Sequence, residues 1–90
     1  MKVVILYRPE SEMARPVETF VHDFQSRYHA VKLEMLSVDE RDGISLASLY
    51  DITSFPALMV LTVEGSVLNV WQGAQLPLID EVASYALGSQ

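Results

Sequence analysis

The hydrophobic residues of this chain fall into short continuous runs and helical stripes that alternate along it. Residues 2–7 form a β-branched and aromatic run that ends before Pro9, which is typical of a strand buried on both faces. A helix is predicted next, because apolar residues recur every three or four positions, at Met13, Val17, Phe20, Val21, Phe24 and Tyr28. Ser11 is a suitable N-cap, but Pro16 would then kink the first turns; alternatively, the helix begins near Pro16.

The middle of the chain predicts a second strand and a short helix. Side chains of residues 31–38 alternate between two faces in the manner of a strand. Residues 39–43 are polar and predict a loop. The apolar spacing from Ile44 to Tyr50 then fits a helix of about two to three turns.

The last third of the chain predicts a hairpin and a final helix. Apolar runs at residues 57–63 and 67–71 flank the turn signal Glu64-Gly65, so the two strands should pair antiparallel. The helix opens at Pro77 and stops at Gly88, with an inner face of Leu78, Ile79, Val82, Ala83 and Ala86. The order β-α-β-α-β-β-α predicts an α/β fold, a central mixed four-stranded sheet flanked by helices.

Several segments resemble thioredoxin. Leu49 to Pro56 is similar to the segment that ends in the cis-proline of that family. Ala57 to Leu61 resembles the strand that follows it, Glu64-Gly65 the hairpin turn, and Trp71 to Ala74 the element before the last helix. The similarity covers nearly the whole chain. It implies a thioredoxin-like fold, with Pro56 in the position of the family's cis-proline.

The resemblance also shows which chemistry is missing. Aligned on the first strand and helix, the two redox cysteines of the family fall on Ser11 and Ala14, and its buried proton-transfer acid falls on Ile5. The chain has no cysteine at all. Because dithiol exchange needs a thiolate and a second sulfur, thiol–disulfide oxidoreductase activity is excluded, and the resemblance implies a redox-inactive member.

Composition and charge narrow the classes of partner. Twelve acids against six bases give a formal charge of -6, and the bases are spread singly, which disfavours nucleic acid and anionic membranes. The first apolar run is too short for a signal peptide, and no stretch approaches the ~20 apolar residues of a membrane span. We therefore expect a single soluble domain over residues 1–90, in the cytoplasm.

The expected function is a non-catalytic protein- or peptide-interaction module. The resemblance implies that the residue before the cis-proline offers backbone groups to an extended ligand. The candidate groove consists of Tyr7, Ser11, Phe55, Pro56, Gly73 and Ala74. No catalytic residue, cofactor or metal is predicted, since His22 and His29 have no third ligand and suit a solvated surface.

Two other functions compete with this one. Ser11 and the Phe55-Pro56 loop would suit a glutathione- or thiol-binding or transferase-like protein, although only Arg8 and Arg15 oppose the acids near the cleft. The chain would alternatively be a structural subunit of a larger assembly. Strand alternation puts Trp71 on one face with Val67 and Asn69, and an outward-facing Trp71 would form an apolar patch for a homodimer.

Overall fold

The computed structural model describes residues 1–73 and 75–87, and its elements follow the predicted order. They are β1 (Lys2–Tyr7), α1 (Ala14–Arg27), β2 (Lys32–Ser37), α2 (Arg41–Leu49), β3 (Ala57–Leu61), β4 (Val67–Gln72) and α3 (Ile79–Ala86). The four strands form one mixed sheet in the order β2-β1-β3-β4, with β1 parallel to β2 and antiparallel to β3. The predicted fold class is confirmed.

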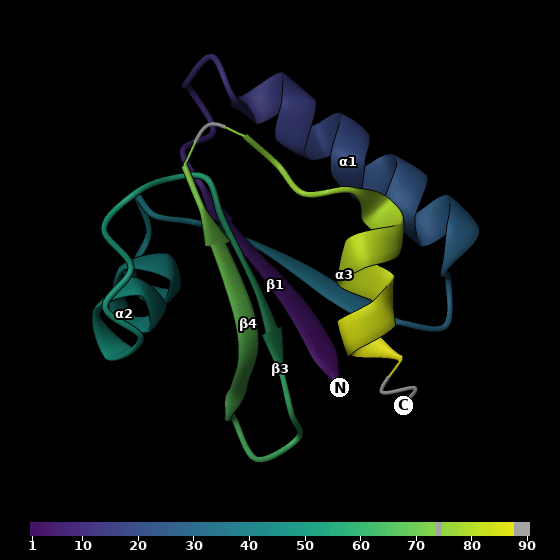
Figure 1. Cartoon of the computed structure of the whole chain (residues 1–90). Coiled ribbons are helices and arrows are strands. Elements are labelled where there is room, and N and C mark those ends of the chain that lie inside the picture. The colour runs from purple at the N-terminus through teal and green to yellow at the C-terminus, as the bar shows by residue number, and fades with distance from the viewer. Residues whose placement is uncertain (74, 88–90) are drawn as a thin grey trace.

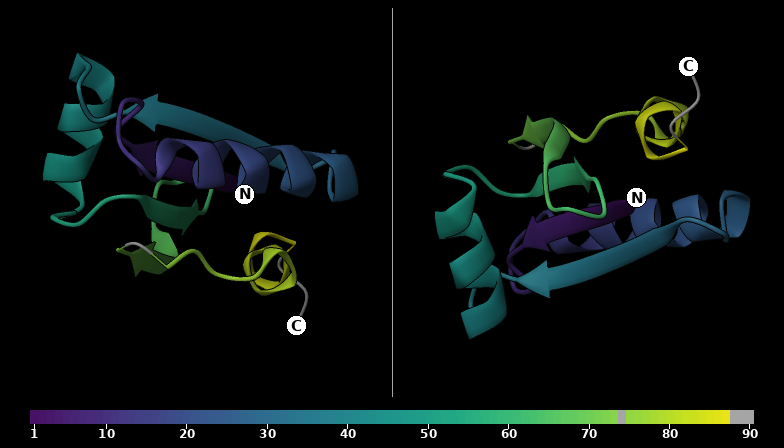
Figure 2. Two further views of the ribbon diagram at one scale, coloured as in Figure 1. Left: turned by 90° about the horizontal axis from the view of Figure 1, so that it is seen from above. Right: turned by 90° about the horizontal axis from the view of Figure 1, so that it is seen from below.

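Three helices cover the sheet unequally, with α1 and α3 on one face and α2 on the other (Figures 1 and 2). The central strand β1 contributes side chains to the hydrophobic core on both faces of the sheet, because its successive side chains point to opposite faces. Val3 and Ile5 pack beneath α1 and α3 with Phe24, whereas Val4 and Leu6 pack on the α2 side. Within the described residues, no helix is long and apolar enough to span a membrane.

The start of α1 agrees with the second alternative, a helix that begins near Pro16, to within two residues. The helix begins at Ala14, and Ser11 is not its N-cap: the Ser11 hydroxyl instead donates to the Arg8 carbonyl oxygen, at 2.8 Å. Pro16 is the third helical residue, where a backbone N–H has no intrahelical acceptor. Its missing donor therefore costs the helix no hydrogen bond.

The other two helices differ from prediction at their starts. Helix α2 begins at Arg41, so the loop between β2 and α2 has only three residues, 38–40, and Gly43 of the predicted loop lies inside the helix. Helix α3 begins at Ile79 rather than Pro77, and Leu78 is 75% exposed instead of facing inward. The predicted stop at Gly88 lies outside the described residues.

Trp71 is an inward residue, contrary to the expectation of an exposed patch. It pairs across the hairpin with the fully buried Leu58 and packs against the α1–α3 side of the core. Its ring meets that of Tyr85 edge to face, with centroids 5.6 Å apart. The helix α3 covers this end of the sheet face, and alternation along β4 alone could not reveal that.

An exposed hydrogen-bonded cluster joins α1 to α3. The Tyr28 hydroxyl donates to Asp80 Oδ1 at 2.7 Å, and Arg27 Nη1 lies 3.2 Å from the same oxygen. The hydrogen bond from Tyr28, and to a smaller extent that from Arg27, lowers the pKa of the Asp80 carboxyl. The same hydrogen bond to Asp80 raises the pKa of the Tyr28 hydroxyl.

We predict that this cluster makes stability depend on pH in the acid range. Because the pKa of Asp80 is lowered by folding, its contribution is present at neutral pH and is lost as the pH falls through that lowered value. Chemical denaturation at neutral and acid pH should show a smaller pH dependence in Asp80→Asn than in wild type. Glu81→Gln changes an acid in the same first turn of α3 and is the matched control. If the pH dependence of stability decreased equally in both variants, the prediction would be contradicted.

Candidate functional site

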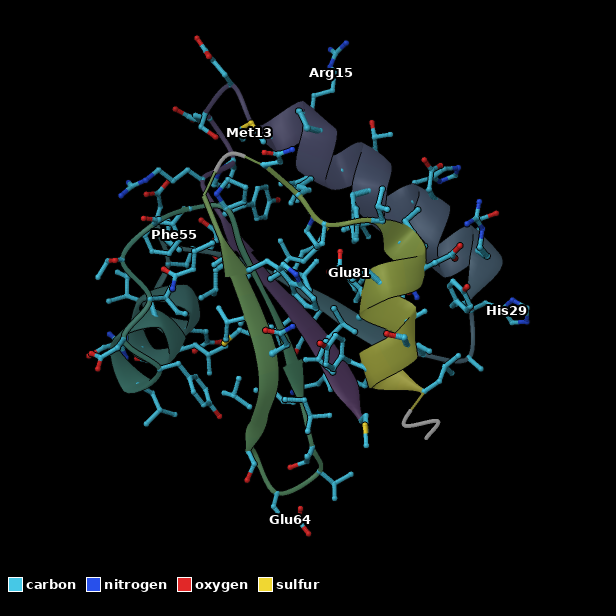
Figure 3. All side chains as sticks on the ribbon, in the orientation of Figure 1. Met13, Arg15, His29, Phe55, Glu64 and Glu81 are labelled. Carbon is cyan, nitrogen blue, oxygen red and sulfur yellow. The ribbon has the colours of Figure 1, made fainter. Side chains whose placement is uncertain are left out.

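A groove of about 310 Å³ lies between the turn that precedes α1 and the loop that precedes β3. Its lining is Arg8, Ser11, Glu12, Met13, Phe55 and Pro56. Figure 3 shows Met13 and Phe55 at the same end of the sheet, opposite the β3–β4 turn that carries Glu64, with Arg15 directed away. Residues far apart in the sequence therefore meet in one groove.

The predicted groove residues are brought together only in part. Ser11, Phe55 and Pro56 line the groove, whereas Tyr7 is half-buried and packs against the α1–α3 side of the core. Gly73 is joined to the groove by its N–H, which donates to the Pro56 carbonyl at 3.0 Å. Ala74 lies outside the described residues.

Three lining residues were not among the six predicted groove residues: Arg8 and Glu12 were expected only as charges near the cleft, and Met13 was not expected there. They flank Ser11 in the sequence, and this proximity was the available signal. Met13 was assigned to the apolar stripe of the helix. It precedes the first helical residue instead, and its half-buried side chain lies in the groove.

The end of α2 directs the chain toward the groove. Asp51 has a φ of 58° and follows the last helical turn, in the left-handed conformation usual for a residue that closes a helix. The N–H of Ile52 returns to the Ala47 carbonyl at 2.8 Å, and Ile52 is buried. This closure anchors the start of the loop that carries Phe55.

Gln72 fixes the middle of the same loop from the neighbouring strand. Its Oε1 accepts hydrogen bonds from the backbone N–H groups of Thr53 and Ser54, each at 3.2 Å. The Phe55–Pro56 peptide bond is cis, as the resemblance implied. Among the described residues, neither the N–H nor the C=O of Phe55 has a hydrogen-bond partner. The loop is therefore held in place, and the backbone N–H and C=O of Phe55 have no partner within the part of the chain that the structure describes.

Arg8 places a positive charge at the rim. Its guanidinium carbon lies 5.6 Å from the centroid of the Phe55 ring, a cation–π geometry. Its Nη1 is 3.6 Å from Asp39 Oδ1, in an ion pair whose side chains are both more than half exposed. Such a pair adds little stability, so Arg8 can exchange Asp39 for another acid at low cost.

The three positions of the absent redox chemistry have structural roles here. Ser11 Oγ donates to the Arg8 carbonyl, so its hydrogen is already engaged. Ala14 is the buried first residue of α1. Ile5 is fully buried in the central strand, between Met35 of β2 and Leu58 of β3. Apolar packing thus fills two of the three positions.

Two further hollows lie on the α2 face, with volumes of about 330 and 410 Å³. Both are lined by Leu46 and Leu61 together with Lys2. The Lys2 ammonium is 3.2 Å from Glu34 Oε1, so its charge is compensated. Although larger, these hollows lack a fixed loop with free backbone groups.

No metal centre is formed among residues 1–73 and 75–87, because no three potential ligands of the His, Cys, Asp or Glu type converge. His22 and His29 are exposed, as expected for a solvated surface. Figure 3 shows His29 beyond the far end of α1, away from Met13 and Phe55. Neither histidine can serve the groove.

Comparison with known proteins supports the fold and nothing finer. No family model matches the sequence, and no curated protein is significantly similar to it. Among solved structures, the oxidised thioredoxin of Plasmodium falciparum is 19% identical with a TM-score of 0.73, covering 93% of this chain and 79% of that one. Thioredoxin 1 of Thermosipho africanus is 13% identical with a TM-score of 0.69, covering 91% and 85%. The chain thus has a thioredoxin-like fold without cysteine.

Proposed function

We propose that this chain is a non-catalytic thioredoxin-like domain that binds an extended segment of a partner protein in the groove beside Pro56. The single observation that carries the proposal is that Phe55 lines the groove and that its backbone N–H and C=O have no partner among residues 1–73 and 75–87. An extended peptide can pair with a free N–H and C=O as one strand pairs with another, and nearby pockets then select its side chains.

The groove has contacts for an apolar side chain and for an acidic side chain of such a segment. Met13 and the Phe55 ring supply apolar surface for one side chain. Arg8, already weakly paired with Asp39, supplies a cation for an acidic residue of the partner. Gln72 holds the loop in place before binding, which lowers the entropy cost of ordering it.

The test uses a phage-displayed library of random linear peptides selected on the immobilised chain. Enriched peptides are then titrated into isotope-labelled protein and followed by NMR. Amide shifts should change at Ser11, Met13 and Phe55. Phe55→Glu should weaken binding roughly tenfold or more, since it removes an apolar side chain that lines the groove. Gln72→Leu should also weaken binding, because it releases Thr53 and Ser54.

Leu49→Glu is the matched control, because Leu49 is 72% exposed on α2 and lines one of the other hollows. It should leave peptide binding unchanged. Binding that is lost in Leu49→Glu and kept in Phe55→Glu would move the site to the α2 face. A library that yields no binding peptide, or saturable glutathione binding at Ser11, would also overturn the proposal.

A further inference from the structure

The strand β4 leaves one edge of the sheet open. It is the last strand in the order of the sheet, and in both views of Figure 2 no described strand lies beyond it, while α3 lies to one side. All six residues of Val67–Gln72 are uncharged, and Val67 and Leu68 are 40% and 41% exposed. The opposite edge strand, β2, carries Lys32 and Glu34. Since charged side chains are a common protection of sheet edges against other strands, the β4 edge needs protection of another kind.

The register of the hairpin shows which backbone groups of β4 face outward. The Gly73 N–H donates to the carbonyl oxygen of Pro56, the residue before β3, so these two residues form a hydrogen-bonded pair. Along antiparallel strands, hydrogen-bonded and non-hydrogen-bonded pairs alternate. Trp71 and Leu58 therefore form a bonded pair, and Val70 and Met59 form a non-bonded one. The N–H and C=O of Val70 point away from β3, toward the open edge.

This outward donor is already occupied. Asn69 Oδ1 accepts the hydrogen bond of the Val70 N–H at 2.8 Å. A strand that added to β4 would need the same N–H, so it would have to displace the Asn69 side chain first. We propose that the Asn69 side chain prevents the β4 edge from pairing with a second copy of this chain.

A second copy is the natural competitor for this edge. Two β4 strands related by a two-fold axis at Val70 would exchange both outward hydrogen bonds of that residue, and Asn69 would then face Trp71 of the second copy. The uncharged edge opposes no like charge, whereas two chains of formal charge -6 repel elsewhere. Removing the Asn69 amide should therefore create a dimer.

The test is Asn69→Ala, with sedimentation velocity over a wide range of concentrations. Wild type should remain monomeric, and the variant should dimerise with a dissociation constant lower by roughly tenfold or more, because two backbone hydrogen bonds become available. Asn69→Asp keeps an acceptor oxygen and should stay monomeric. Adding Leu68→Lys to Asn69→Ala should restore the monomer by charging the edge.

Hydrogen exchange in wild type tests the same idea without any variant. Val70 and Gln72 both direct their N–H outward, but only Val70 has the Asn69 cap, so its amide should exchange more slowly than that of Gln72. Equal exchange of the two amides would overturn the proposal. So would a folded Asn69→Ala protein that stays monomeric, or a wild-type dimer that Leu68→Lys disrupts.

Discussion

Ile5→Asp should strongly destabilise the protein, although it restores a carboxyl where thioredoxins have one. Ile5 is fully buried at the centre of the sheet. The substitution removes apolar packing and buries a polar group with no partner, which together cost about 4 kcal/mol or more. A chain of this size has a stability of roughly 5–13 kcal/mol at ~0.05–0.15 kcal/mol per residue. The melting temperature should fall by about 16 °C or more.

The pH dependence of Ile5→Asp distinguishes a buried charge from a simple cavity. Burial raises the pKa of a carboxyl, so the penalty should be smallest in acid and grow as the pH rises above about 4. Ile5→Val should cost only about 0.5–1.5 kcal/mol, without pH dependence. Val63→Asp, at an 86% exposed position, should be nearly neutral. Equal melting temperatures for Ile5→Asp and Val63→Asp would show that Ile5 is not part of the core.

This result concerns function, because dithiol chemistry needs two cysteines and a proton-transfer group together and cannot be restored by a single substitution. Cysteines at positions 11 and 14 would lack a proton-transfer group, and the position that could supply it is committed to packing. The groove beside Pro56 does not depend on Ile5. Its geometry rests on Gln72 and on the closure of α2 at Asp51.

Elements with a strong local pattern could be predicted from the sequence. The continuous apolar run of β1 predicts a buried strand, and the apolar stripe through Phe20 and Phe24 predicts the buried face of a helix. Each pattern can be recognised within its own segment. The hairpin turn at Gly65 is likewise local, since its φ of 92° favours glycine. The groove residues Ser11, Phe55 and Pro56 were found through the family resemblance.

Features that depend on distant contacts could not be predicted. The direction of Trp71 is decided by α3, which covers it with Tyr85. A bulge places Val67 opposite Leu61 and Asn69 opposite Val60, so strict alternation fails along β4. The bonds from Thr53 and Ser54 to Gln72 span 19 and 18 residues. No local pattern contains such information.

Gly43→Ala should destabilise the protein, although the same change usually stabilises a helix. Alanine is favoured over glycine by about 1 kcal/mol within helices. At Gly43, however, an added Cβ would overlap the carbonyl oxygen of Ser37 and lie 2.6 Å from its carbonyl carbon. Both atoms belong to the backbone at the end of β2, and that oxygen also accepts the Glu40 N–H at 3.2 Å. Helix α2 must therefore move away from the sheet.

The displacement of α2 should outweigh the gain in helix propensity. Overpacking of this kind costs about 1–3 kcal/mol, and more where backbone must shift, so we expect a net loss of about 2 kcal/mol. That corresponds to a fall of roughly 8–16 °C in melting temperature. Ser48→Ala, at an exposed position of the same helix, has no such overlap and should be neutral or slightly stabilising. If Gly43→Ala matched Ser48→Ala, α2 would not approach β2 as closely as the structure has it.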